Sequence, residues 1–238
     1  MNAEEKRARR RIILTAGTSL LIGFPVLAAT APQKHSNGHE IDPDAGVTAP
    51  EDLMKEHGVL NRCLLIYEEG LRRLHSEEVV EPDVFHHVAS LIRRFVEEYH
   101  EQNEEKYIFP VFEQHKKLLD LVETLKTQHR AGRTLTARIL QCSTSEPFRS
   151  RDNQSTLVTA IQGFIRMYRP HESREDTVLF PALRTLLRPK QVEDLGDRME
   201  EAEHKVLGEK GFEKSVAEVA NLEKHLGIYD LKQFTPTV

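Results

Sequence analysis

The residues that suggest chemistry form an internal repeat. Residues 100–110 and residues 171–181 both follow the pattern H-E-x-x-E-[ED]-x-x-[IL]-F-P, at an offset of 71 residues. Each copy has a further histidine upstream: His57 lies 43 residues before the first copy, and His129 lies 42 residues before the second. The repeated unit is therefore one histidine, then His-x3-Glu, then Phe-Pro. Two matched units are much harder to obtain by chance than one His-x3-Glu.

The spacing inside each unit suits metal binding. On a helix, residues four apart are separated by about 40° and about 6 Å, so His100 and Glu104 point the same way from neighbouring turns. A first-row metal ion accepts imidazole nitrogen and carboxylate oxygen together. If two such pairs face each other, each carboxylate reaches two ions, and coordination positions stay open for a small ligand. The predicted ligands are His57, His100, Glu104, His129, His171 and Glu175.

Three further features lie beside these ligands. His204 either completes the site from a later helix or is an ordinary surface histidine. Tyr107 either packs in the core or donates a hydrogen bond to a bound oxygen species. In each repeat the Phe-Pro pair should place phenylalanine beneath the metals, where it keeps the cavity dry, and proline where it kinks the helix beyond the site.

This arrangement resembles the hemerythrin-like, or HHE cation-binding, family over residues 52–187, and more loosely to about 210. The resemblance implies a four-helix bundle with a non-haem di-iron centre, in which two irons, bridged by oxide or hydroxide, are held by the six residues named above. Manganese or zinc fits the same donors. Oxygen-carrying hemerythrins would have a second histidine at the position of Arg133. They would also have an aspartate where Asp176 falls, although Glu175 repeats Glu104 more directly.

Three functions follow from this comparison. The first is a metal-binding protein that binds or senses dioxygen or a related small molecule. The second is a di-iron enzyme that acts on peroxide, nitric oxide or ferrous iron. The carboxylate-rich ligand set is similar both to family members linked to iron or oxygen sensing and to those linked to peroxide and nitric oxide chemistry. The third is a helical interaction module without metal, against which the matched repeats argue. The sequence indicates no stable protein partner, nucleophilic triad or phosphate-binding glycine loop.

Helix formers dominate the chain from residue 50, with few internal breakers. We therefore expect an all-α fold: an up-down four-helix bundle with an additional C-terminal helix. The domain should cover residues 50–238, with the bundle over about 50–187 and a helical extension over about 189–226. The expected helices run from about 49 to 75, 81 to 116, 117 to 141, 153 to 187, 189 to 207 and 213 to 225.

The first 31 residues predict a targeting segment. Five basic residues precede an apolar stretch over residues 12–29, and Ala28 is a plausible last residue before cleavage. The pattern is similar to a twin-arginine signal and predicts a periplasmic protein. The alternatives are an uncleaved anchor in the inner membrane, through residues 12–29 alone, and a cytoplasmic protein. Residues 32–49 contain prolines and glycines and predict a flexible linker.

The overall composition limits the choice of partners and of redox chemistry. The formal net charge is −5 and no basic stripe is present, which argues against nucleic-acid binding. The two cysteines, Cys63 and Cys142, form no C-x-x-C motif, so a thiolate zinc site is not expected. We expect two buried thiols, with a disulfide between them as the alternative.

Overall fold

The computed structural model describes residues 48–237 of the chain, and within them it contains helices and no strand. The predicted signal segment (1–31) and nearly all of the predicted linker (32–49) lie outside the described residues. The all-α prediction is confirmed. Apart from the three-residue α4, the α-helices of residues 48–237 are α2 (Ala49–His75), α3 (Pro82–Leu91), α5 (Phe109–His115), α6 (Leu119–Cys142), α7 (Arg151–Arg174), α8 (Phe180–Leu186), α9 (Pro189–Val206) and α10 (Gly211–His225).

Short helical segments join some of these elements into continuous rods. The π-helices Ile92–His100 and Glu104–Ile108, with the short α4 (Glu101–Asn103) between them, connect α3 to α5. A third π-helix, Glu175–Leu179, connects α7 to α8. The observed rod boundaries fall within about two residues of the expected ones. Two 3₁₀ turns, Pro147–Arg149 and Leu231–Phe234, complete the helical structure of residues 48–237.

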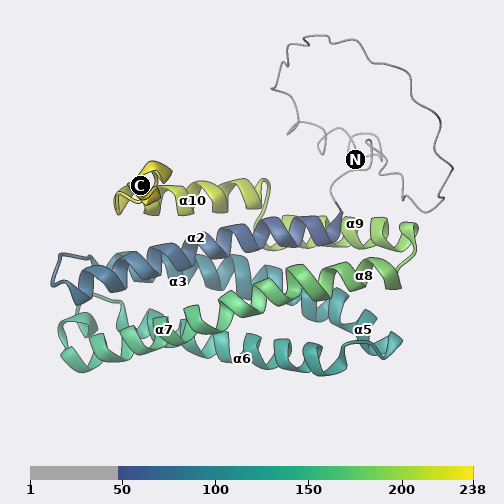
Figure 1. Cartoon of the computed structure of the whole chain (residues 1–238), viewed down its shortest axis with the longest axis horizontal. Coiled ribbons are helices and arrows are strands. Elements are labelled where there is room, and N and C mark those ends of the chain that lie inside the picture. The colour runs from purple at the N-terminus through teal and green to yellow at the C-terminus, as the bar shows by residue number, and fades with distance from the viewer. Residues whose placement is uncertain (1–47, 238) are drawn as a thin grey trace, which may run out of the picture. The chain divides into compact units, whose positions relative to one another are not determined.

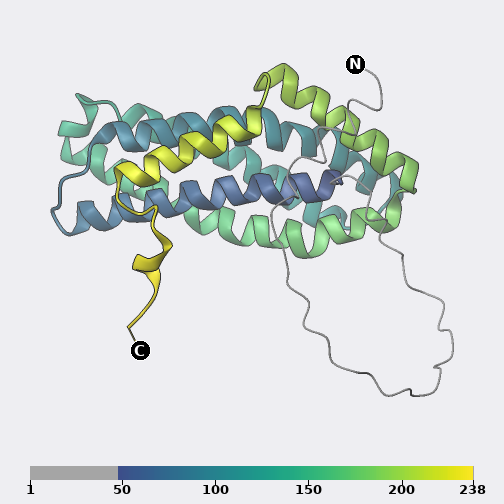
Figure 2. The ribbon, with the colours of Figure 1, turned by 90° about the horizontal axis from the view of Figure 1, so that it is seen from above.

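The first four rods form a helical bundle in which successive rods run in opposite directions. Figure 1 shows α2 running back along the rod that begins with α3, and α6 running antiparallel to α7 below them. The views in Figure 1 and Figure 2 agree that α9 and α10 lie outside these four rods, along α2. Short connections between long amphipathic helices favour this antiparallel arrangement.

The repeated proline has a visible effect on the helices. The π-helix that begins at Glu104 ends two residues before Pro110, and the one that begins at Glu175 ends two residues before Pro181. Proline has no N–H for the carbonyl four residues earlier, and its ring crowds that carbonyl. In both copies a wider π turn precedes the proline, and the helix then continues. The departure from regular α-helix therefore includes the turn that contains the glutamate.

The apolar core is divided into two clusters. One contains Phe85, Phe95 and Phe164, and the other contains Phe109 and Phe180. In each of the four long rods, the predicted ligands fall in the stretch of sequence between the residues of the two clusters. A buried polar layer therefore crosses the bundle between its two apolar parts.

The outer helices close the bundle on the side of α2. Leu195 and Met199 of α9 are buried in the second cluster, and Val219 of α10 is buried in the first. Arg62 of α2 binds Glu223 of α10 through two hydrogen bonds of 2.9 and 2.5 Å. The break between α9 and α10 was expected at the glycines there, and Gly208 has a φ of +76°, in the left-handed region that favours glycine.

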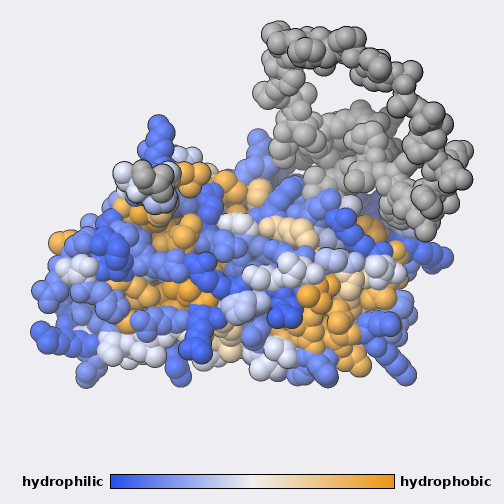
Figure 3. All heavy atoms as spheres, in the orientation of Figure 1, coloured by the Kyte–Doolittle hydropathy of each residue, from blue (hydrophilic) through white to orange (hydrophobic). Residues whose placement is uncertain are grey.

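Both cysteines are buried and free, as expected. Among the helices of residues 48–237, none combines the length and the apolar character needed to cross a membrane. Figure 3 shows a visible face on which hydrophilic side chains predominate, with hydrophobic patches between them.

Candidate metal centre

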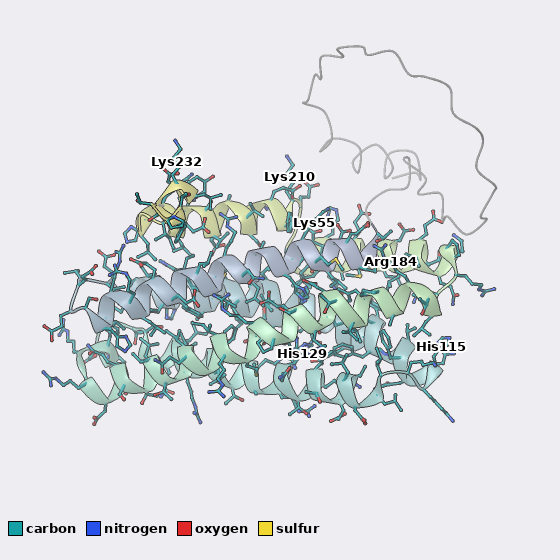
Figure 4. The ribbon with its side chains drawn as sticks, in the orientation of Figure 1. Lys55, His115, His129, Arg184, Lys210 and Lys232 are labelled. Atoms are coloured by element: carbon teal, nitrogen blue, oxygen red, sulfur yellow. The ribbon has the colours of Figure 1, made fainter. Side chains whose placement is uncertain are left out.

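The structure brings all six residues of the repeat together in the buried polar layer. They form two groups, and within each group the possible ligand atoms lie within 4.8 Å of one another. One group contains His57 and His100, the other contains His129 and His171, and both groups include Glu104 and Glu175. Figure 4 shows that His129 lies midway along the bundle, in contrast to His115 at the end of α5.

Each glutamate faces one histidine from each half of the repeat. Glu175 Oε2 lies 3.3 Å from His57 Nε2 and 3.2 Å from His171 Nε2. Glu104 Oε2 lies 3.6 Å from His100 Nε2 and 3.4 Å from His129 Nε2. The two glutamates are thus placed to bridge two metal positions, each of which has two imidazoles of its own. We call these the first position (His57 and His100) and the second position (His129 and His171).

Within the first position the two imidazoles converge. Their Nε2 atoms lie 3.1 Å apart, within hydrogen-bond distance, and this is also about the separation of two adjacent nitrogen ligands on one metal ion. Across the two positions, five buried polar atoms have no hydrogen-bond partner among the described residues. These are both carboxylate oxygens of Glu104, both carboxylate oxygens of Glu175, and His129 Nε2. Buried polar atoms without partners are costly, and cations at the two positions would satisfy all five.

The second ring nitrogen of every histidine is held by a polar side chain. His57 Nδ1 donates to Asp176 Oδ1 at 2.7 Å, and His129 Nδ1 donates to Glu105 Oε1 at 2.9 Å. In both cases the acceptor directly follows the glutamate ligand of the opposite half. Such a bond fixes the tautomer, so that Nε2 offers its lone pair to a metal.

The downstream histidines follow the same rule within their own halves. His100 Nδ1 donates to Glu56 Oε2 at 2.7 Å, and His171 Nδ1 donates to Gln128 Oε1 at 2.9 Å. Each acceptor directly precedes the upstream histidine of that half. The four bonds therefore repeat the two-fold pseudosymmetry of the six ligands.

Asp176 is thereby assigned to a role beside the centre. Its carboxylate holds His57 and belongs to neither group of potential ligands, whereas Glu175 belongs to both. The sequence left these two acids in competition. The structure favours the glutamate that repeats Glu104.

Aromatic rings of the second apolar cluster cover the side of the centre that faces this cluster. Phe180 stacks on His57 with ring centroids 5.6 Å apart, and Phe109 stacks on His129 with centroids 5.5 Å apart. Both phenylalanines are fully buried. The expectation that the repeated phenylalanine packs beneath the predicted ligands is confirmed.

The buried acids and histidines of the centre shift one another's pKa values. Burial and the neighbouring Glu175 raise the pKa of Glu104 well above its usual range. Burial alone would raise the pKa of Glu175 too, but His171 and His57 hold it well below that range. Burial would lower the pKa of His57, but Asp176 and Glu175 raise it to about 10. Metal ions that bind to these groups would displace their protons.

A second pair of buried acids flanks the centre. Glu101 accepts a hydrogen bond of 2.5 Å from the Tyr168 hydroxyl and pairs with Arg133 at 2.9 Å. Its counterpart in the other half, Glu172, accepts a hydrogen bond from Asn61. Glu101, Glu105 and His129 also lie close enough together to suggest a cation site. Arg133 already pairs with both of these carboxylates, so its guanidinium fills that role.

His204 is not brought to the centre. It is exposed on α9 and belongs to neither group of potential ligands among residues 48–237. Tyr107 is half-buried and packs against the second apolar cluster, with the Lys106 ammonium 4.7 Å from its ring centroid. The packing interpretation of Tyr107 is therefore the one that the structure favours.

The sequence patterns above did not predict the side chains that accept hydrogen bonds from the histidine Nδ1 atoms. Their signal was present, because a polar residue directly precedes each upstream histidine and directly follows each glutamate ligand. These residues are Glu56, Gln128, Glu105 and Asp176. Tyr99, which donates to Glu56 at 2.8 Å, carried no comparable signal.

Comparison with known proteins agrees with this geometry. The family model described as the hemerythrin HHE cation binding domain matches residues 48–183 and again residues 120–227. The chain belongs to this family. The second match begins in α6, the helix that opens the second half of the repeat.

Close relatives are found in mycobacteria. Uncharacterized protein Rv1995 of Mycobacterium tuberculosis and Uncharacterized protein Mb2018 of Mycobacterium bovis are each 43% identical over 232 residues. These alignments cover 96% of this chain and 91% of each relative. No solved structure matches the chain.

Proposed function

We propose that this chain holds two iron ions in an up-down four-helix bundle and binds or senses dioxygen or a related small molecule. One observation carries the proposal: Glu104 and Glu175 each place a carboxylate oxygen between a histidine of the first position and a histidine of the second. Four imidazoles and two shared carboxylates suit a pair of first-row metal ions.

Each residue of the centre has a defined part in this proposal. The histidines would hold the ions through Nε2, because their Nδ1 atoms are engaged by Asp176, Glu56, Glu105 and Gln128. Glu104 and Glu175 would bridge the two ions. Phe109 and Phe180, which stack on His129 and His57, would exclude water from that side. His204, being exposed, is left out of the proposed ligand set.

Burial restricts the size of the molecule that reaches the centre. None of the six proposed ligands is more than 4% exposed. A diatomic molecule or peroxide could enter through small side-chain motions, whereas a larger organic substrate could not. When bound, two ferrous ions would supply open coordination positions and two electrons for such a ligand.

The second candidate function is turnover at the same centre, with peroxide, nitric oxide or ferrous iron as substrate. It is favoured by Arg133, which occupies the position where an oxygen carrier would have an additional histidine. The Arg133 guanidinium pairs with Glu101 and Glu105 and so is not available as a metal ligand. Each metal position is left with two imidazoles and the two shared carboxylates.

A spectroscopic titration of the iron-loaded protein tests the proposal. Ferrous protein should change its absorption on exposure to dioxygen or nitric oxide with a stoichiometry of one molecule per centre. Return of the original spectrum after the gas is removed would support binding or sensing. Consumption of many equivalents of peroxide or ferrous iron per chain would establish the enzyme instead. An iron-loaded protein that responds to none of these molecules would contradict both functions.

A further inference from the structure

The two metal positions have matching inner ligands but unequal surroundings. Each position has two imidazoles and shares Glu104 and Glu175. The side chains behind those imidazoles break the pseudosymmetry, because they differ in charge between the two halves. This difference bears on how strongly each position attracts a cation.

Two carboxylates stand behind the first position. Glu56 accepts from His100 Nδ1 and Asp176 accepts from His57 Nδ1, each at 2.7 Å. The Tyr99 hydroxyl donates to the other oxygen of Glu56 at 2.8 Å, so both oxygens of this carboxylate are held in place. Among the ion pairs of residues 48–237, none places an arginine or a lysine on either acid.

Behind the second position the negative charge is smaller, because Arg133 pairs there with both nearby carboxylates, Glu101 and Glu105. Gln128, the counterpart of Glu56, offers His171 a neutral amide oxygen at 2.9 Å. Glu105, the counterpart of Asp176, bonds His129, but the same oxygen lies 2.7 Å from Arg133. The matching residue to Arg133 in the first half is the neutral Asn61.

We propose that the first position, between His57 and His100, binds its metal ion more tightly than the second and fills before it. This inference rests on the proposed di-metal function. A carboxylate that accepts from the far nitrogen of an imidazole makes that ring a stronger donor, and in a buried site its charge also attracts the cation directly. The neutral amide of Gln128 strengthens its imidazole less and attracts a cation less. At the second position, Arg133 also weakens both effects of Glu105 through its positive charge.

Paired single-site variants separate the two positions. His100 and His171 are equivalent residues of the two halves of the repeat. His171→Ala disrupts the second position and leaves the first intact, whereas His100→Ala disrupts the first and leaves the second intact. We expect cobalt(II) to bind to the His171→Ala protein at least about tenfold more tightly than to the His100→Ala protein, in calorimetric titration under argon. Equal affinities, or the opposite order, would overturn the inference.

A charge exchange checks the cause without removing a ligand. In the wild-type protein, cobalt titration should resolve two binding constants that differ by about tenfold or more. The double substitution Glu56→Gln with Gln128→Glu keeps the net charge and should bring the two constants together. Glu98→Gln removes one charge from an exposed position on the same rod as His100 and should leave the separation intact.

These variants keep their proposed ligands, so they also serve if the alanine variants fail to fold. Two indistinguishable constants in the wild-type protein, or a separation that the exchange leaves unchanged, would refute the inference while leaving the di-metal centre in place. Absence of any cobalt binding to the folded wild-type protein would instead count against the proposed function.

Discussion

At the residue scale, each histidine of the centre is held at both ends of its ring. One nitrogen faces a shared carboxylate and the other donates to a side chain that follows or precedes a proposed ligand in the chain. Orientation is thereby fixed before any metal arrives. Glu104 and Glu175 receive no such support, since their four oxygens have no hydrogen-bond partner among the described residues. The carboxylates are the part of the site that most requires cations.

Removing one histidine from either half should lower the metal content. We expect His100→Ala and His171→Ala each to reduce the iron content from two ions to about one per chain, because each position loses one of its two imidazoles. His204→Ala, in an exposed side chain, should leave the content unchanged. Metal analysis after removal of loosely bound ions measures this. The same iron content in all three variants would contradict the ligand assignment.

Metal affinity should fall as the pH is lowered. In the metal-free protein, burial and Glu175 raise the pKa of Glu104 well above its usual range. Asp176 and Glu175 outweigh burial and raise the pKa of His57 to about 10, so His57 carries an extra proton near neutrality. A metal ion must displace such protons, and each displaced proton weakens binding by about tenfold per unit decrease in pH. Chelator competition between about pH 8 and about pH 6 would detect this. An affinity independent of pH would show that the ligands are already deprotonated.

The sequence was sufficient to predict which six residues meet, because helical spacing and a duplicated pattern specify faces and partners. It was not sufficient to predict the acceptors behind the histidines. Asp176 and His57 lie 119 residues apart in the chain, so whether they meet depends on the axial register of the two helices that carry them. Likewise, Arg133 was visible as a departure from the oxygen-carrier pattern, but its pairing with Glu101 and Glu105 required the folded arrangement.

At the scale of the helices, the repeat determines local geometry as well as ligands. Both glutamates start a π turn that ends just before a Phe-Pro pair. Helix periodicity and breakers located the rods to within about two residues, since these signals are local. The π turns were not predicted, because an apolar pattern does not distinguish a wide turn from a regular α-helical one. The proline supplied the only local indication that the helix departs from regular geometry there.

Close packing between α6 and α7 makes a glycine necessary beside the centre. A Cβ atom on Gly132 would lie 2.1 Å from the Tyr168 hydroxyl, which donates to Glu101. Gly132→Ala should therefore lower the free energy of unfolding by about 1–3 kcal/mol.

The matched control is Gly163→Ala in α7, where a Cβ atom would meet only Leu135 side-chain atoms, at 3.8 Å. It should raise the free energy of unfolding by up to about 1 kcal/mol, because alanine is the better helix former. Denaturant unfolding of both variants measures the difference. A Gly132→Ala protein as stable as the control would show that Tyr168 moves aside without cost.

At the scale of the whole molecule, the bundle surrounds a polar layer with apolar packing on both sides. The larger cluster includes Phe95 and Phe164, and the smaller one includes Phe109 and Phe180. Burial of such a polar layer opposes folding, and burial of the two apolar clusters offsets this cost. The outer helices add to both clusters and are not required to complete the ligand set.

The N-terminal segment carries a separate prediction about location. We propose that residues 1–28 direct export to the periplasm and are then removed, because basic residues precede an apolar stretch that ends in small residues. N-terminal sequencing of the exported protein should find Ala29 as the first residue. Recovery of the intact N-terminus from the membrane fraction would favour the anchor, and its recovery from the cytoplasm would contradict export.

The most direct test of the central claim is the metal stoichiometry of the wild-type protein, purified after growth with ample iron and examined together with its absorption spectrum. We predict about two irons per chain and near-ultraviolet ligand-to-iron charge-transfer bands, because the four histidines and two shared carboxylates define two positions. A folded protein with no metal, or with a single iron that no excess raises to two, would contradict a di-iron centre.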